Sequence, residues 1–485
     1  MRIRALAAAC VAAAATLFAQ NPPNPAPPVR EQPFLDWRAP DGSRFVLIQD
    51  RAGYRAPVVH WVTLVPTDPA DEPAGAEGLA RAIVRASVDG SGGTGSLDAE
   101  RENEALDRLD DLERRVLAAR RRGEQPPETE LRTTRAATAA LGVPDAWRRS
   151  LARSGATDLE LREIDGASLI HVACPTESLR EVALLVRERR EAPLLRDLRR
   201  TFDAVRAELR VAADSPAGRL QRDVLGAAFP GIAAARPIGE HPRLWTRGEA
   251  LALFGTIHHP TRGLHVLTGG FDAQRVRELL AAVFTDTRLP PTAAPPPPAP
   301  SEARARRAVI PSTGAHALAV AWPQPNAAPE LLLATAEWLA GGRTSRIATG
   351  LRGAGLGEVE VSYRVPFPVQ ARPGVLVVQV IAEAANPRNA DLERLVVELL
   401  QNAATTGPGG AEMGRIRGRA NNRAASWSIG TRDAGFVVAE HAGLHGRDVA
   451  TLFLEFVPPE SDALKNIAVQ LERAPRTIVA LQVTR

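Results

Sequence analysis

A proline-rich segment divides this chain into two parts that repeat one pattern, and this repeat constrains the fold more than any other feature. Residues 289–300 have the composition of a stiff, extended linker. Before the linker, strand-like residues 58–65 lead through a Pro/Asp turn into a helix that carries Arg81. After it, strand-like residues 316–322 lead through a turn into an expected helix over 329–340, with Pro at the tolerated first position. The repeat predicts an internal duplication.

Length and composition agree with two globular domains of mixed secondary structure. The chain has 485 residues, 45% of them hydrophobic and 24% charged, which suits more than one core. Strands and helices in this order predict the α+β class, with homologous α/β domains over 33–288 and 307–485 and a linker over 289–306. Between residues 98 and 151 the apolar residues fall at helical spacing with a Gly/Pro break, so we expect an inserted helical hairpin.

The ends and the charges of the chain suggest where it acts. Residues 1–19 read as a secretory signal, with two arginines, an apolar stretch and a small residue at the cut, and a Pro-rich tether follows over 20–32. We therefore expect export, to the periplasm or the medium, and no later stretch of about 18 apolar residues that would span a membrane. Cys174 is then the only cysteine of the mature chain, which leaves no internal disulfide. Acids interleaved with Arg120–Arg122, and a net charge of only +4, argue against nucleic acid as a partner.

The helix around Arg81 carries the most specific motif. Residues 72–85 read Glu-Pro-Ala-Gly-Ala-Glu-Gly-Leu-Ala-Arg-Ala-Ile-Val-Arg. This segment resembles the zinc-binding helix of the M16 peptidases (pitrilysin, insulinase and the processing peptidases), with Arg81-x-x-Val84-Arg85 in place of His-x-x-Glu-His. The resemblance implies that two histidines would hold Zn²⁺ and that the glutamate would activate water. Because arginine cannot ligate a cation and valine cannot accept a proton, we expect neither catalysis nor zinc.

Two later segments resemble the same family in the same order. Glu208 falls at the position of the third zinc ligand, but Thr201 replaces the glutamate expected seven residues earlier. Residues 339–357 are similar to the signature of the second domain, whose Arg/Tyr pair helps to hold substrate. Arg352 occupies the arginine position and Glu358 the tyrosine position, so Arg352 is the expected substrate-binding residue. The resemblance implies two homologous domains of the LuxS/M16 type.

The expected function is that of an exported, non-catalytic M16-like protein without a cofactor. The resemblance implies a peptide-binding subunit that partners an active M16 chain or itself as a dimer, with the peptide added as a strand to a sheet edge. A stand-alone peptide-binding or scaffold protein remains open. So does a residual metalloendopeptidase with relocated ligands, for which His441 and His445 have suitable spacing.

Overall fold

The computed structural model describes two mixed sheets and the helices that cover them. It describes residues 34–49, 57–285, 306–312, 315–322, 327–356, 359–364, 376–383, 391–429 and 431–483. The expected signal peptide, the tether and the proline run of the linker lie outside these residues. Among the helices that are described, none combines the length and hydrophobicity that a membrane span requires.

The first sheet has the strand order β1-β2-β6-β3-β5-β4 and the second the order β7-β11-β8-β10-β9. The first comprises β1 (Phe34–Arg38), β2 (Arg44–Gln49), β3 (Val58–Pro66), β4 (Thr157–Ile164), β5 (Ala167–Pro175) and β6 (Leu264–Gly269). The second comprises β7 (Arg306–Ser312), β8 (Ala315–Trp322), β9 (Val359–Arg364), β10 (Leu376–Glu383) and β11 (Thr477–Val483).

The two sheets share one topology, which confirms the predicted duplication. The order β2-β6-β3-β5-β4 corresponds strand by strand to β7-β11-β8-β10-β9. In each sheet the first of these pairs is parallel, β2 with β6 and β7 with β11, and the other pairs are antiparallel. The α+β class is therefore confirmed, and the strand–turn–helix repeat corresponds to β3 and α2 in the first half and to β8 and α11 in the second.

Helices cover both faces of the first sheet, because its strands are apolar on both sides. In β2, Phe45 and Leu47 belong to the core formed with the helices of the first half, whereas Val46 and Ile48 face the opposite layer. Such continuous burial is typical of a sheet enclosed between two helical layers. The helices of this half are α2 (Leu79–Ser87), α3 (Ala99–Arg121), α4 (Glu128–Ala139), α5 (Ala146–Arg153), α6 (Leu179–Glu191), α7 (Leu198–Asp214), α8 (Pro216–Ala228), α9 (Arg247–Ile257) and α10 (Ala273–Val283), with short 3₁₀ turns η1 (Thr176–Ser178) and η2 (Ala233–Ala235).

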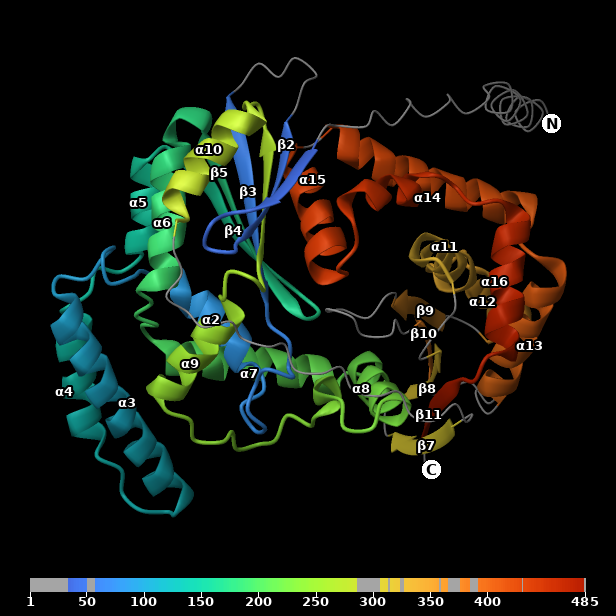
Figure 1. Cartoon of the computed structure of the whole chain (residues 1–485). Helices are drawn as coiled ribbons and strands as arrows, with labels where there is room; N and C mark the ends of the chain where they lie inside the picture. Colours follow the sequence, from blue (N-terminus) through green and yellow to red (C-terminus); the bar gives the residue numbers. More distant parts are fainter. Residues whose placement is uncertain are drawn as a thin grey trace, which may run out of the picture.

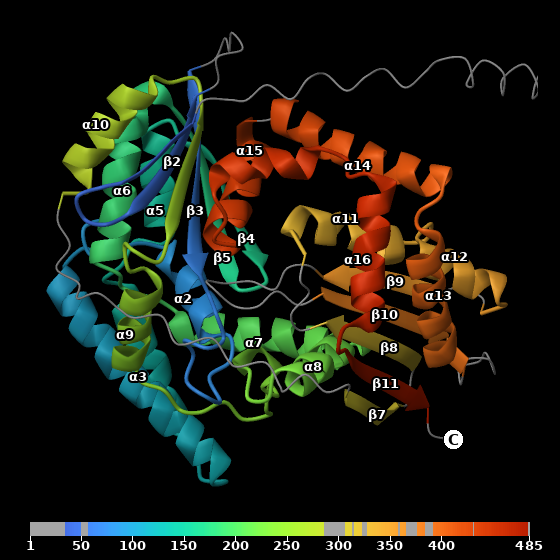
Figure 2. The same ribbon diagram turned by 45° about the vertical axis from the view of Figure 1, so that its right-hand side comes forward.

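The halves exchange helices, as Figures 1 and 2 show. Helix α8 leaves the first half and buries Leu220 and Val224 against Ala319 and Val377 of the second sheet. In return, Phe436 and its neighbours on α15 pack on the face of the first sheet that is opposite to α6 and turned toward the second half (Figure 1). The helices of the second half are α11 (Pro329–Ala340), α12 (Arg346–Gly353), α13 (Leu392–Thr406), α14 (Gly410–Ile429), α15 (Thr431–Val438) and α16 (Ser461–Arg473), with the π-helical η4 (Ala439–Leu444) and the 3₁₀ helix η5 (Val449–Phe456).

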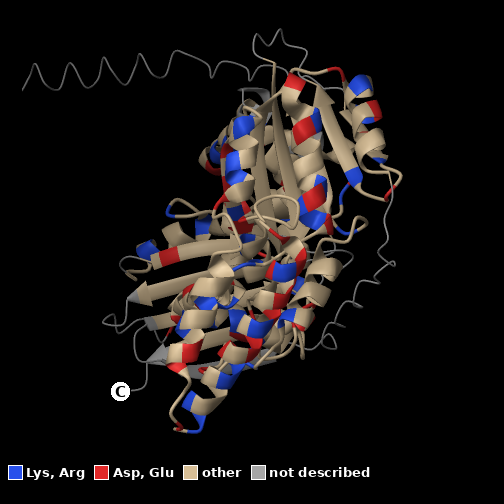
Figure 3. Cartoon of the chain, turned by 90° about the vertical axis from the view of Figure 1, so that its left-hand side faces the viewer, with Lys and Arg blue, Asp and Glu red and all other residues tan. Residues whose placement is uncertain are grey.

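The inserted helical hairpin is present and stands apart from the sheet layers. Helix α3 begins at an N-cap, Asp98, whose side chain accepts a hydrogen bond from the Arg101 amide at 3.1 Å. The chain breaks around Gly123, where φ is +70°, and returns as α4, which packs against α3. Figure 3 shows that acidic and basic side chains alternate along the helices, while the strands carry few charges. The alternation explains why the arginines of this hairpin create no extended basic surface.

Candidate functional site

A buried carboxylate and two glycines fix the start of α2. Glu72 accepts hydrogen bonds from the amides of Gly78 and Ala80 at 2.9 and 2.8 Å, and so satisfies two donors at the helix start. Burial raises the pKa of Glu72 to about 7, although those two amides act in the opposite direction. Gly78 has a φ of +94°, and a Cβ there would lie 2.8 Å from Leu209 of α7. The Glu-Pro-x-Gly-x-x-Gly segment thus brings α2 close to α7.

The two arginines of α2 face an acidic pair on β4 and α7. Arg85 donates from both terminal nitrogens to the carboxylate of Glu208, at 2.9 and 2.8 Å, and from Nε to Glu163 at 3.3 Å. Arg81 donates to the carbonyl of Ile164 at 3.3 Å, and its Nε lies 3.9 Å from Glu163. The hydrogen bonds with Glu208 raise the pKa of Arg85, and the same contact lowers the pKa of Glu208. Arg85 therefore links α2 to both β4 and α7.

These side chains do not fit a divalent metal ion. A guanidinium has no free lone pair for a metal, and both oxygens of Glu208 already accept from Arg85. Val84, at the position of the catalytic glutamate, is fully buried in the core of the first half. Within the described residues, no group of three or more His, Cys, Asp or Glu side chains is arranged to hold a metal.

A cavity of about 180 Å³ adjoins Arg81. Glu72 and Glu77 lie on its polar side and Leu209 and Ile238 on its apolar side. The hydroxyl of Thr67, which also lines the cavity, is buried without a hydrogen-bond partner in the structure. The cavity is large enough for a single side chain of a ligand and is lined by Arg81.

The second half contains a counterpart of this site with the charges reversed. Helix α11 corresponds to α2 in chain order, β9 to β4 and α14 to α7. Glu337 of α11 accepts from Arg423 of α14 at 2.8 Å and from the Tyr363 hydroxyl of β9 at 3.1 Å. In both halves a polar cluster therefore joins the same three elements, and in the first half Arg85 forms this link.

The structure does not bring Arg352 to the arginines of α2. Arg352 is exposed on α12, where it donates to the carbonyl of Arg343, and α12 and α2 lie on opposite sides of the molecule in both views (Figures 1 and 2). Glu358 lies outside the described residues, so its relation to Arg352 stays a prediction. Thr201 lies in the first turn of α7, away from the Arg85 contact made by Glu208.

The alternative ligands His441 and His445 lie in and directly after the π-helical turn η4. His441 is buried, and its Nε2 lies 3.0 Å from the carbonyl of Asp448 and 3.1 Å from the Thr451 hydroxyl. This ring therefore joins η4 to η5 through neutral polar groups, and no carboxylate in these contacts completes a ligand set.

Sequence reasoning missed Glu163, which contacts both arginines. Glu163 lies on β4 and reaches Arg85 only because the inserted hairpin returns the chain to the sheet 78 residues later. No local motif marks it, although it follows Arg162 in a strand of alternating side chains. Arg162 instead stacks on Phe436 of α15 at 3.9 Å, since successive strand residues face opposite layers.

Comparisons with known proteins agree with this architecture. Residues 245–419 match the family model described as the peptidase M16 inactive domain. A protease from Helicobacter pylori has a similar structure, with a TM-score of 0.67 and 15% identity over 93% of this chain and 99% of that one. The M16 inactive domain from Pseudomonas fluorescens gives 0.64 and 13% identity, covering 93% and 98%. The periplasmic protease PqqL from Escherichia coli gives 0.65 and 12% identity, covering 94% of this chain and 46% of that one. No curated protein matches.

The fold is that of the M16 peptidases, as the ordered motifs predicted. Residues 245–419 are similar to the M16 inactive domain, and the described residues share the fold of M16 peptidase-like proteins.

Proposed function

We propose that this chain is an exported, non-catalytic M16-like subunit that binds an extended peptide and assists an active M16 chain. The observation that carries the proposal is the double hydrogen bond from Arg85 to Glu208. The guanidinium of Arg85 occupies the carboxylate of Glu208, which the resemblance makes the third zinc ligand. Zinc chemistry is then lost, while the helices and strands around the site are kept.

The peptide would add to β4, an edge strand of the first sheet. In the described part of the chain β4 pairs only with β5, and its hairpin with β5 projects between the two halves (Figure 1). Unpaired amides and carbonyls on a strand edge can pair with an added strand. The cavity beside Arg81 would then receive one side chain of the ligand.

Hydrogen exchange tests this arrangement directly. Addition of an unfolded peptide should slow amide exchange in β4 (Thr157–Ile164), whereas β1 (Phe34–Arg38), the other edge of the same sheet, serves as the internal control. Equal protection of both edges, or of neither, contradicts binding at β4.

Zinc content and peptide cleavage test the loss of catalysis and the role of a partner. The purified chain should contain no zinc and cleave nothing, and should change the cleavage rate or substrate range of its nearest encoded active homologue. Cleavage by the chain alone would refute the proposal. A homologue unaffected by the chain would instead favour a stand-alone peptide-binding protein.

Export rests on residues 1–19 and agrees with the periplasmic location stated for PqqL. Amino-terminal sequencing of the protein from cell fractions should find a mature chain that begins near residue 20. An intact amino terminus in the cytoplasmic fraction would contradict export.

A further inference from the structure

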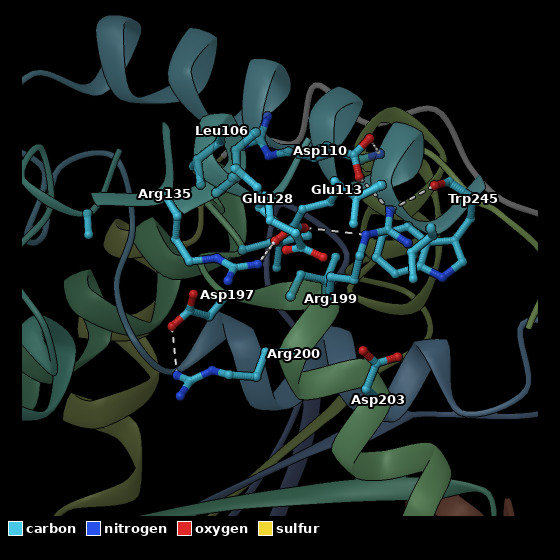
Figure 4. A pocket seen from close by; sticks show the side chains of 18 of the residues that line it. Leu106, Asp110, Glu113, Glu128, Arg135, Asp197, Arg199, Arg200, Asp203 and Trp245 are labelled. Atoms are coloured by element: carbon cyan, nitrogen blue, oxygen red, sulfur yellow. Dashed lines mark hydrogen bonds and ion pairs between the residues drawn. The ribbon is translucent and has the colours of Figure 1, made fainter. Parts of the chain in front are cut away.

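A second cavity, of about 640 Å³, lies beneath the inserted hairpin and away from the arginines of α2 (Figure 4). Helices α3 and α4 form one side of it, and the start of α7 with Trp245 forms the other. Sites for small molecules typically measure about 300 to 1,000 Å³. The cavity is therefore of a size to enclose a small ligand.

Charged contacts join the hairpin to the body of the domain beside this space. On the body, Arg199 contacts Asp110 of α3 at 2.6 Å, and Arg247 contacts Asp107 at 2.8 Å. The apolar residues of the hairpin form a small cluster of their own that does not merge with the main core: Leu109, Leu112, Val116 and Leu131. These side chains are almost fully buried, and Leu109, Val116 and Leu131 among them line the cavity.

The charges on the cavity wall are paired with one exception. The arginine pairs are Arg120 with Glu128, Arg135 with Glu113, Arg199 with Asp110, Arg200 with Asp197 and Arg247 with Asp107. Within the described residues, the carboxylate of Asp203 forms no hydrogen bond or ion pair; Figure 4 shows it below Arg199 and level with Arg200. Asp203 is exposed to solvent on α7, and the partial desolvation of its carboxyl raises its pKa, although Arg199 and Arg206 act in the opposite direction.

We propose that this cavity binds a small organic cation with an apolar body. The ammonium group would lie against Asp203, and the body would contact leucines on the wall such as Leu109 and Leu198. A cation is favoured over an anion because the unpaired charge of the wall is negative, whereas each guanidinium already has an acid. The site is separate from the peptide edge at β4 and does not depend on the proposed function.

The probes are three small molecules of similar size that differ in charge. Phenethylammonium, 2-phenylethanol and 3-phenylpropionate share an aromatic body and differ in charge, and calorimetry on the full chain measures their binding. We expect the cation to bind up to about fivefold more tightly than the alcohol, as one exposed ionic contact allows, and the anion to bind most weakly. Equal binding of cation and alcohol, or no saturable binding of the cation, would overturn the proposal.

Two pairs of variants locate the site. Asp203→Asn should remove the preference for the cation, whereas Asp214→Asn, at the exposed end of the same helix, should leave it unchanged. Ala139→Phe places a ring in the cavity and should block binding, whereas Ala137→Phe, on the same helix but off the cavity wall, should not. Both alanines are exposed, so folding should persist. Retention of the cation preference in Asp203→Asn would refute the role of this carboxylate.

Discussion

A histidine pair at the seam between the halves should make the protein sensitive to acid. His171 is completely buried on β5, and its Nε2 lies 3.1 Å from Nδ1 of His60 on β3. The other ring nitrogen lies 3.1 Å from the carbonyl of Asp158, to which it can donate only when it carries the hydrogen. In its neutral form His171 then accepts from His60 through Nε2, and protonation of Nε2 would remove that acceptor. Phe436 of α15 packs on His171, with ring centroids 5.5 Å apart.

The sign of the effect follows from the pKa of His171. Burial, then His60 and Arg432, lower that pKa to about 4 from the ordinary 6.5, and burial and Arg432 lower the pKa of His60 too. Asp158, Glu160 and Asp433 act in the opposite direction on the pair without reversing it. Because the unfolded chain takes up a proton first, the stability provided by neutral His171 is complete above pH 6.5 and is lost as the pH falls through 4.

The magnitude is sufficient to measure. At about 1.4 kcal/mol per pH unit, the difference between 6.5 and about 4 corresponds to roughly 3 kcal/mol, of which roughly 2.5 kcal/mol is lost by pH 4.5. Urea unfolding at pH 7.5 and 4.5, followed by tryptophan fluorescence, should show wild type losing more stability than His171→Gln by about 2 to 3 kcal/mol. The control His241→Gln removes an exposed histidine and should behave as wild type. Parallel losses in wild type and His171→Gln would refute the reasoning.

Three other changes test the site and the exchange of helices. A double-mutant cycle with Arg85→Met and Glu208→Gln should give a coupling free energy of unfolding of about 1 kcal/mol. The contact is bidentate, which favours coupling, but the Glu208 side chain is 58% exposed, which limits it. Additive effects of the two substitutions would contradict a direct link. The double variant Arg81→His with Arg85→His should contain zinc in elemental analysis, because Glu208 stays in place as a third ligand. It should still cleave no peptide, because Val84 cannot act as a base. A metal-free double variant would show that Glu208 cannot serve as the third ligand. Leu220→Ala should lower the free energy of unfolding by about 2 to 5 kcal/mol. It should also speed proteolysis within the second half, although Leu220 precedes the linker, because α8 packs on the second sheet. Unchanged proteolysis there would contradict this packing.

Much of the fold could be predicted because its signals are local. The proline at position 329 starts α11, and the Gly/Pro break around Gly123 separates α3 from α4. The exchange of α8 and α15 between the sheets could not be predicted. An amphipathic helix such as α8 shows that it buries Leu220 and Val224, but its sequence does not specify which sheet receives them.

The candidate site divides in the same way. The expected loss of zinc chemistry follows from the identities of Arg81, Val84 and Arg85, since it depends only on what each side chain can bind, and it stays a prediction. That Arg85 links α2 to β4 and α7 could not be predicted, because the link needs Glu163 and Glu208 from distant elements.

By itself, the sequence determined the class of fold: a duplicated α+β chain of the M16 type, with Arg81, Val84 and Arg85 where the resemblance expects the catalytic motif. The duplication, the α+β class and the turn before α2 depend on residue identity, spacing and short-range turns, none of which requires a long-range contact. Only the tertiary structure decided what the altered residues do now. It joined Arg85 to Glu208, buried His171 beneath Phe436 and left Asp203 facing a cavity under the hairpin. Each of these depends on elements that lie far apart in the chain and meet only when the helices pack on the two sheets.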